Sequence, residues 1–243
     1  RFIPGDPAAR LLARMGNQLR PEEIVALRQV FGISDAPLFV QYIEYLGNVL
    51  RGDLGRSISR FPSPVTDVIG VALFWTILLS GVALVISFTL GNLLGIIGTW
   101  RRGGLIDSIM PPVLIFIGAF PYFWLAMVAL YFLGFQLNLF PLRHAYASHF
   151  TPALTPDFIG SVLRHLILPA GTIVVVSIGG WALGMRNTMI SVLSEDYVVF
   201  AEAKGLSPQR IMFQYAARNA LLPAITSLGL SLGFILSGAL LTE

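Results

Sequence analysis

Four stretches of the chain are apolar and free of charged residues for long enough to cross a lipid bilayer, which takes about 20 residues of helix. They are residues 68–98, 108–133, 165–185 and 222–241. Soluble proteins seldom keep such long runs free of charge in four places. The pattern predicts an all-α, polytopic membrane protein, in which Pro111, Pro121 and Pro169 begin or kink helices.

The polar connections between these spans predict which side of the membrane they face. Arg101 and Arg102 lie between the first two spans, and a longer basic connection lies between the last two. Cytoplasmic loops carry an excess of arginine and lysine. We therefore expect a cytoplasmic loop over residues 191–222 and an external region over residues 1–67, and this arrangement implies a further span before residue 1.

The external region carries helical patterns of its own. Pro21, Glu22 and Glu23 are typical of a helix start, and Gly32 can end that helix. A second amphipathic stretch, over residues 38–49, is expected to lie along the membrane surface.

Small and hydroxylated residues recur on the spans. Glycines four residues apart predict close helix packing, and they occur at Gly91 and Gly95, Gly180 and Gly184, and Gly229 and Gly233. Hydroxyl groups can line a polar path or hydrogen-bond between helices, and both interpretations stay open. The candidate pathway residues are Thr76, Ser80, Ser177, Ser227 and Ser231.

Composition agrees with a membrane protein and excludes several other classes. Hydrophobic residues make up 55% of the chain and charged residues 12%, whereas about a quarter of an average soluble domain is charged. The net charge is +3, and the arginines are scattered, so we do not expect nucleic acid as a partner. Cysteine is absent, which excludes disulfides and thiolate-bound metals.

The sequence lacks the residues and motifs that ion coupling, ATP binding or hydrolysis would need. No charged residue interrupts the spans, although ion-coupled carriers use such residues as relays. The phosphate-binding G-x-x-x-x-G-K-[ST] motif and the common hydrolase motifs do not occur. His144, His149 and His165 match no metal-binding spacing. We expect a non-catalytic chain without cofactor or metal, whose energy comes from another subunit.

The connection between the last two spans has the pattern of two short helices joined by a fixed turn. Ser194 is a candidate N-cap, and Lys204 suits the last turn of a first helix. Gly205 then stands where a left-handed residue ends the helix, so that Leu206 can fold back. Ser207 and Pro208 are typical of the start of a second helix.

The motifs of this chain resemble one family, the inner-membrane permeases of binding-protein-dependent ABC importers, in the dipeptide, oligopeptide and nickel branch. The resemblance extends over the whole chain. It includes Pro4-Gly5-Asp6-Pro7, Gly52-Asp53-Leu54-Gly55-Arg56-Ser57, Phe140-Pro141, His165-Leu166-Ile167-Leu168-Pro169, Ala203-Lys204-Gly205 and Arg218-Asn219-Ala220. The family's Glu-Ala-Ala motif falls on Val199, Phe200 and Ala201, where Ala201 alone matches.

The resemblance implies a type I ABC importer permease fold in the inner or plasma membrane, with six spans in the intact chain, four of them largely visible here. It implies a homologous permease, two ATPase subunits that hold ATP and magnesium, and an external substrate-binding protein. The residues implied in coupling to the ATPase are Tyr197, Ala201, Ala203, Lys204, Gly205, Leu206, Ser207, Pro208, Arg218 and Asn219.

Alternatives stay open for the transported substrate and for the class of protein. Peptide is the first expectation from the resemblance, followed by oligosaccharide and nickel chelate. An ATP-independent channel or scaffold is the alternative of another class.

Overall fold

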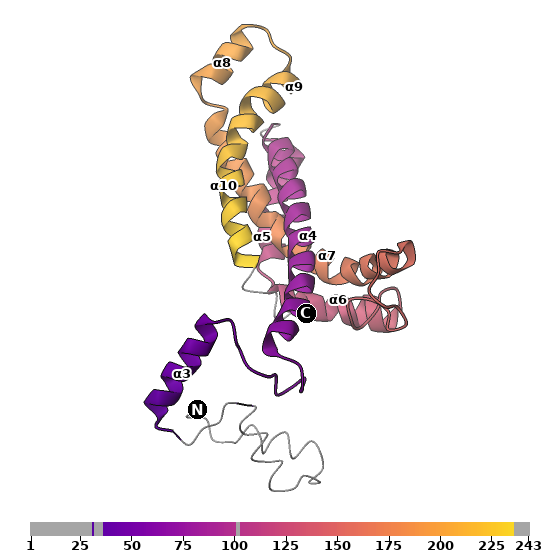
Figure 1. The fold of residues 1–243 in the computed structure, drawn as a ribbon. Helices are drawn as coiled ribbons and strands as arrows, with labels where there is room; N and C mark the ends of the chain where they lie inside the picture. The colour runs from indigo at the N-terminus through magenta and orange to yellow at the C-terminus, as the bar shows by residue number, and fades with distance from the viewer. Residues whose placement is uncertain (1–30, 32–35, 101–102, 236–243) are drawn as a thin grey trace. The chain divides into compact units, whose positions relative to one another are not determined.

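The computed structural model describes residues 31, 36–100 and 103–235 (Figure 1). It divides into two compact units, residues 1–74 and 75–243, and each is described by itself. The regular elements of the described residues are helices, with one isolated bridge between Arg56 and Pro64. This agrees with the predicted all-α class.

The first unit contains the helix α3, Leu38–Leu50, which confirms the predicted amphipathic stretch as a helix. None of its residues is buried, and apolar side chains such as Phe39 and Tyr42 remain exposed. The helix expected from Pro21 to Gly32 lies outside the described residues. After α3, Gly55 donates a backbone hydrogen bond of 2.9 Å to Asp53 Oδ1, which closes a tight turn.

Two long helices confirm the first and third predicted spans. They are α4, Val65–Trp100, and α7, Pro156–Val192, and both are apolar enough to cross a membrane. At 1.5 Å per residue, each is about 54 Å long, which exceeds the thickness of the hydrocarbon core. Figure 1 shows that α7 changes direction along its course, and Pro169 inside the helix is the residue that explains a bend.

The second predicted span is broken rather than continuous. It consists of α5, Leu105–Gly118, and α6, Tyr122–Ala129, which runs on into the π-helix η1, Leu130–Gln136. The two parts meet at an angle of 87°, as in a broken span or a re-entrant loop. Pro121 precedes α6 in an extended conformation, and proline disfavours helix in the residue before it, so a new helix begins there, as predicted for this proline.

The last part of the described chain forms the helices α8, Asp196–Ala203, and α9, Pro208–Arg210, then the π-helix η2, Ile211–Ala217, and α10, Arg218–Ile235. In Figure 1, α8 and α9 lie together at the far end of α10, which packs against α7. The fourth predicted span begins in α10, and its last part, residues 236–241, lies outside the described residues.

The first glycine pair forms the predicted close helix crossing. A Cβ atom on Gly91 would lie 2.5 Å from Trp181 Cβ, and one on Gly95 would lie 2.5 Å from the carbonyl oxygen of Ala182. Helices α4 and α7 can approach this closely only because both positions lack a side chain. The other two pairs differ from the prediction. A Cβ atom there would meet nothing within 4 Å in the described chain, and the four glycines are Gly180, Gly184, Gly229 and Gly233.

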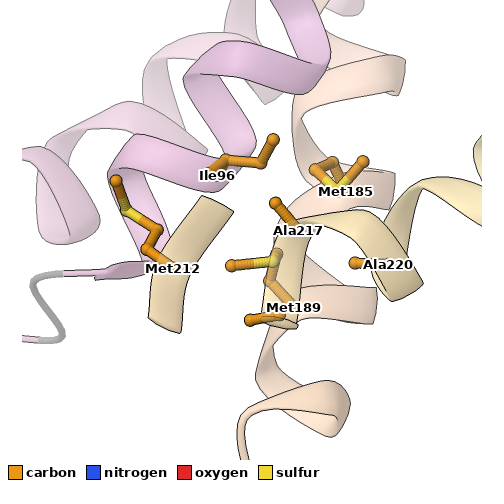
Figure 2. Packing of buried hydrophobic residues seen from close by; sticks show 7 residues of the cluster. Ile96, Met185, Met189, Met212, Ala217 and Ala220 are labelled. Atoms are coloured by element: carbon orange, nitrogen blue, oxygen red, sulfur yellow. The ribbon is translucent and has the colours of Figure 1, made fainter. Parts of the chain in front are cut away.

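A buried apolar cluster continues the crossing toward the ends of α4 and α7 (Figure 2). Met185 and Met189 of α7 meet Ile96 of α4 and Met212 of η2. Ala217 of η2 and Ala220 of α10 also belong to this cluster. Methionine fills irregular gaps between helices because its side chain is unbranched and flexible.

We expect Gly95→Ala to destabilise the protein, because the new methyl group must push α4 away from α7. The cost of such overpacking is about 1–3 kcal/mol. The measurement is the midpoint of thermal unfolding in detergent, compared with Gly81→Ala. Gly81 lies on the same helix with nothing within 4 Å of its would-be Cβ, so that control should keep or raise the midpoint. Equal midpoints for the two variants would contradict the crossing.

Candidate functional site

The turn between α8 and α9 has the hydrogen bonds of a Schellman motif. Gly205 N–H donates to Glu202 O at 2.8 Å, and Leu206 N–H donates to Ala201 O at 3.3 Å. Gly205 has φ +72°, the left-handed conformation that favours glycine. The predicted helix end and the fold-back of Leu206 are therefore confirmed.

The start of α8 differs from the prediction by one residue. Its N-cap is Glu195 rather than Ser194, and no side chain caps the helix. The Ser194 hydroxyl instead donates to Ser191 O at 2.7 Å, just beyond the end of α7. A serine hydroxyl can bond back to a carbonyl three residues earlier as readily as it caps the next helix, and the sequence alone does not separate the two.

We use the name inner hairpin for residues 196–217, which comprise α8, the turn, α9 and η2. Its two arms are held together by buried Val198 and Ala201 of α8 and Ile211 of η2, with Leu206 packed against them. Trp100 at the end of α4 also packs on this cluster. The inner hairpin is therefore a folded unit that is attached to the ends of the long helices.

Both arms of the inner hairpin carry exposed apolar side chains. Val199 is 54% exposed, Phe200 66% and Phe213 48%. The Lys204 ammonium lies 5.5 Å from the centre of the Phe200 ring. Sequence reasoning missed these three apolar residues as a surface, because their exposure depends on how the two arms pair.

The ten predicted coupling residues fall into different positions on this unit. Ala201 is buried, and Leu206 packs against the core of the inner hairpin, so neither forms its outer face. Arg218 and Asn219 begin α10, where Asn219 Nδ2 donates to Tyr215 O at 2.9 Å. The remaining residues are exposed on α8 or around the turn, and they are Tyr197, Ala203, Lys204, Gly205, Ser207 and Pro208.

The second arm of the inner hairpin does not end before the fourth predicted span. Helical backbone continues from α9 through η2 into α10. Met212, Ala216 and Ala217 of η2 also belong to the buried cluster of α4 and α7. The second arm of the inner hairpin and α10 therefore form one continuous helix. π-helical turns are rare and frequently occur at functional sites.

An ion pair that the sequence did not predict joins α5 to α7. Arg186 Nε donates to Asp107 Oδ1 at 2.9 Å, and its terminal nitrogen lies 2.7 Å from the same oxygen. Asp107 Oδ2 also accepts the Gly103 N–H at 3.1 Å. This pairing lets α7 continue past Arg186, where the third predicted span was expected to stop at Met185.

A groove runs along α4, α7 and α10. We call it the polar groove after the serine and asparagine side chains that lie among its mostly apolar lining. It consists of two adjoining hollows of about 340 and 370 Å³ that share Ser177 and Trp181. Of the candidate pathway residues, Ser80 and Ser231 line one hollow and Ser227 lines the other. Thr76 is buried and lines neither.

The hydroxyl groups on α10 bond within their own helix. Ser227 Oγ donates to Pro223 O at 3.0 Å, and Ser231 Oγ donates to Ser227 O at 2.8 Å. In the described chain their protons therefore do not bond to a neighbouring helix. The pathway role of these serines stays a prediction.

The connection between η1 and α7 forms a separate hollow of about 920 Å³. Arg143, Arg164 and Asp157 contribute charged groups to it, and His165 Nδ1 lies 2.7 Å from Ser161 O. Within the described ranges, no group of three or more potential metal-ligating side chains comes together.

Comparison with known proteins identifies the class. Residues 91–243 match the family model described as "Binding-protein-dependent transport system inner membrane component". The chain belongs to this family. Two relatives align with the whole chain. The probable peptide ABC transporter permease y4tP of Sinorhizobium fredii is 33% identical, and the alignment covers 74% of its length. The di/tripeptide permease DppB of Pseudomonas aeruginosa is 35% identical, and the alignment covers 75% of its length.

A third relative is the oligopeptide transport system permease AppB of Bacillus subtilis, which is 32% identical over the whole chain and 74% of its own length. The chain is thus a multi-pass permease of the cell membrane, as its sequence predicted. The family is a transport component rather than a known catalytic subunit.

We expect Asp107→Asn to destabilise the permease, because it leaves Arg186 half-buried without its ionic partner. The side chain of Asp107 is 13% exposed and that of Arg186 is 24% exposed. The loss of stability should therefore lie between roughly 1 kcal/mol, as for a surface ion pair, and roughly 3 kcal/mol or more, as for a buried one. The measurement is the thermal midpoint in detergent. Asp67→Asn, an exposed acid in the first turn of α4, is the matched control, and an equal loss there would contradict this role.

Proposed function

We propose that this permease forms the translocation pathway for peptides in an ATP-driven importer. It works with a homologous permease, two ATPase subunits and an external substrate-binding protein. Three relatives named for peptide, di/tripeptide and oligopeptide transport support the cargo. The observation that carries the coupling role is the inner hairpin, a folded unit whose second arm continues as α10.

The inner hairpin docks on the ATPase through its exposed face. Val199, Phe200 and Phe213 supply apolar contact area, and Lys204 adds a positive charge beside it. An apolar surface of this kind, exposed at the tip of a folded unit, is typical of a protein interface. The Gly205 turn sets the angle between the two arms and so determines which side chains meet the partner.

Movement of the ATPase then passes to the spans along two connections. The first is the continuous helix from α9 through η2 into α10. The second is the contact of Met212 and Ala217 with Met185 and Ile96 in the buried cluster. Because a packed cluster transmits displacement with little compression, tilting the inner hairpin shifts α10 and α7 together and alternately opens the groove to the two sides.

ATP hydrolysis belongs to the partner subunits, which hold ATP and magnesium, and this chain contributes no catalytic group.

The loop over residues 191–222 is cytoplasmic, and residues 1–67 are external. The basic residues of the loop support this orientation, since cytoplasmic loops are enriched in arginine and lysine. α3, with its uncovered apolar side chains, lies along the outer membrane surface.

The polar groove is the part of the pathway that this chain supplies. Ser80, Ser177, Ser227 and Ser231 line it, and the residues around both hollows carry no formal charge. A neutral polar lining suits peptides, because peptides share a backbone but differ in side-chain charge.

The importer is tested by reconstituting the full complex in proteoliposomes with ATP on the ATPase side and the loaded binding protein on the other. We expect a labelled dipeptide to accumulate only when ATP and the ATPase subunits are both present. Flux through vesicles that contain this chain alone would indicate a channel. Accumulation of an oligosaccharide or a nickel chelate in place of dipeptide would contradict the peptide cargo.

The docking role is tested at Gly205. We expect Gly205→Val to lower both co-purification of the ATPase and ATP-dependent uptake by about tenfold, because a left-handed conformation costs a non-glycine residue roughly 1–2 kcal/mol. A Cβ atom at Gly205 would meet nothing within 4 Å, so the effect comes from the backbone rather than from a clash.

Gly205→Asn is the matched control, since asparagine tolerates the left-handed conformation. It should retain most association and uptake. If Gly205→Val keeps normal ATPase association and normal uptake, the inner hairpin is not the docking element.

A further inference from the structure

Asn92, in the last third of α4, has a side-chain oxygen without a hydrogen-bond partner. The residue is 4% exposed, and its Nδ2 donates to Phe88 O at 2.7 Å. Among the described residues, Asn92 Oδ1 is the buried side-chain polar atom that makes no hydrogen bond. Asn92 also lines the smaller hollow of the polar groove, beside Ser177 and Gly180.

An unpaired amide oxygen in this place needs a physical explanation. A buried acceptor without a donor costs about 1–3 kcal/mol, and lipid offers no water to replace the donor. Asn92 lies eight residues before the end of α4 at Trp100, which is about 12 Å along the helix axis. Because Asn92 lines the hollow, a ligand that enters the groove can supply the missing donor.

Three hydroxyl groups along the groove offer further acceptors. The hydroxyl protons of Thr188, Ser227 and Ser231 are used by carbonyl oxygens one turn earlier in their own helices. Their oxygens therefore remain available as acceptors. No acidic or basic side chain lines the hollow of Asn92. The groove thus suits a neutral hydrogen-bond donor, whereas an ammonium group would favour a carboxylate partner.

The shape of the site favours a narrow ligand. Gly180 and Gly184 line the hollow, and a Cβ atom on either would meet nothing within 4 Å. The hollow measures about 340 Å³, within the roughly 300–1,000 Å³ of small-molecule sites. A peptide backbone is narrow and presents a neutral N–H at each peptide bond.

We propose that Asn92 is a specificity-determining residue of the pathway, whose Oδ1 accepts a hydrogen bond from a backbone N–H of the passing peptide. The inference rests on the proposed function, since it requires that peptides move through the groove. It adds that the permease itself selects for a peptide N–H, in addition to any selection by the binding protein.

The test compares two cargoes that differ at a single N–H. Glycylglycine has a peptide N–H, and glycylsarcosine carries a methyl group in its place. Initial uptake rates of both are measured in the reconstituted complex for wild type, Asn92→Leu and Asn92→Ala. The ratio of the two rates is compared between variants, which cancels the preference of the binding protein because that protein is the same throughout.

We expect the preference of wild type for glycylglycine to fall by about threefold in both variants, the factor that one neutral hydrogen bond supplies. Thr89→Val is the matched control. Thr89 lies one turn earlier on α4, is exposed, and donates to Val85 O at 2.8 Å. It lines neither hollow, so its ratio should equal that of wild type.

Three results would overturn the inference. An unchanged ratio in both Asn92 variants, with uptake retained, leaves the peptide importer intact but removes this role of Asn92. Loss of the second permease from the complex in both variants, with uptake of both dipeptides abolished, assigns Asn92 to the subunit interface. If wild type imports neither dipeptide, the proposed function itself fails, and the inference fails with it.

Discussion

The close approach of α4 to α7 at Gly91 and Gly95 is the contact on which the rest of the permease depends. Trp181, which faces Gly91, also lines the polar groove. Met185, which faces Gly95, belongs to the cluster beneath the inner hairpin. The two functional regions therefore share one helix crossing, and a larger residue at either glycine would disturb both regions.

The coupling role proposed for the inner hairpin rests on how rigidly its parts are joined. The Schellman turn at Gly205 holds its arms, and Val198 and Ile211 bury their side chains between them. The hairpin differs from a flexible loop because its second arm has no break before α10. A coupling element needs this property, since a flexible joint would absorb the movement that it should transmit.

The groove presents polar side chains, and none of the residues that line it carries a formal charge. Serine and threonine bond to their own helices, which satisfies their protons and leaves oxygens available. Asn92 cannot do so completely, because its oxygen has no backbone N–H within reach in a continuous helix. The proposed role of Asn92 follows from that difference.

Several errors of sequence reasoning have a common cause. Pro121 was expected to begin or kink a helix and does so, but the size of the bend, 87°, was not predicted. Gly180, Gly184, Gly229 and Gly233 were expected to pack closely, yet a Cβ atom on any of them would meet nothing within 4 Å in the described chain. The ion pair of Asp107 with Arg186 joins residues 79 positions apart. None of these features leaves a local signal, because each depends on which helix lies opposite.

The sequence by itself determined the membrane class, the long helices α4 and α7, and the Gly205 turn, because apolar length and capping residues act over a few neighbouring positions. Only the tertiary structure decided which glycine pair crosses, which serines share a groove, and which apolar residues of the inner hairpin face outward. Those features arise from contacts between segments far apart in the chain, and such contacts follow from packing rather than from local preference.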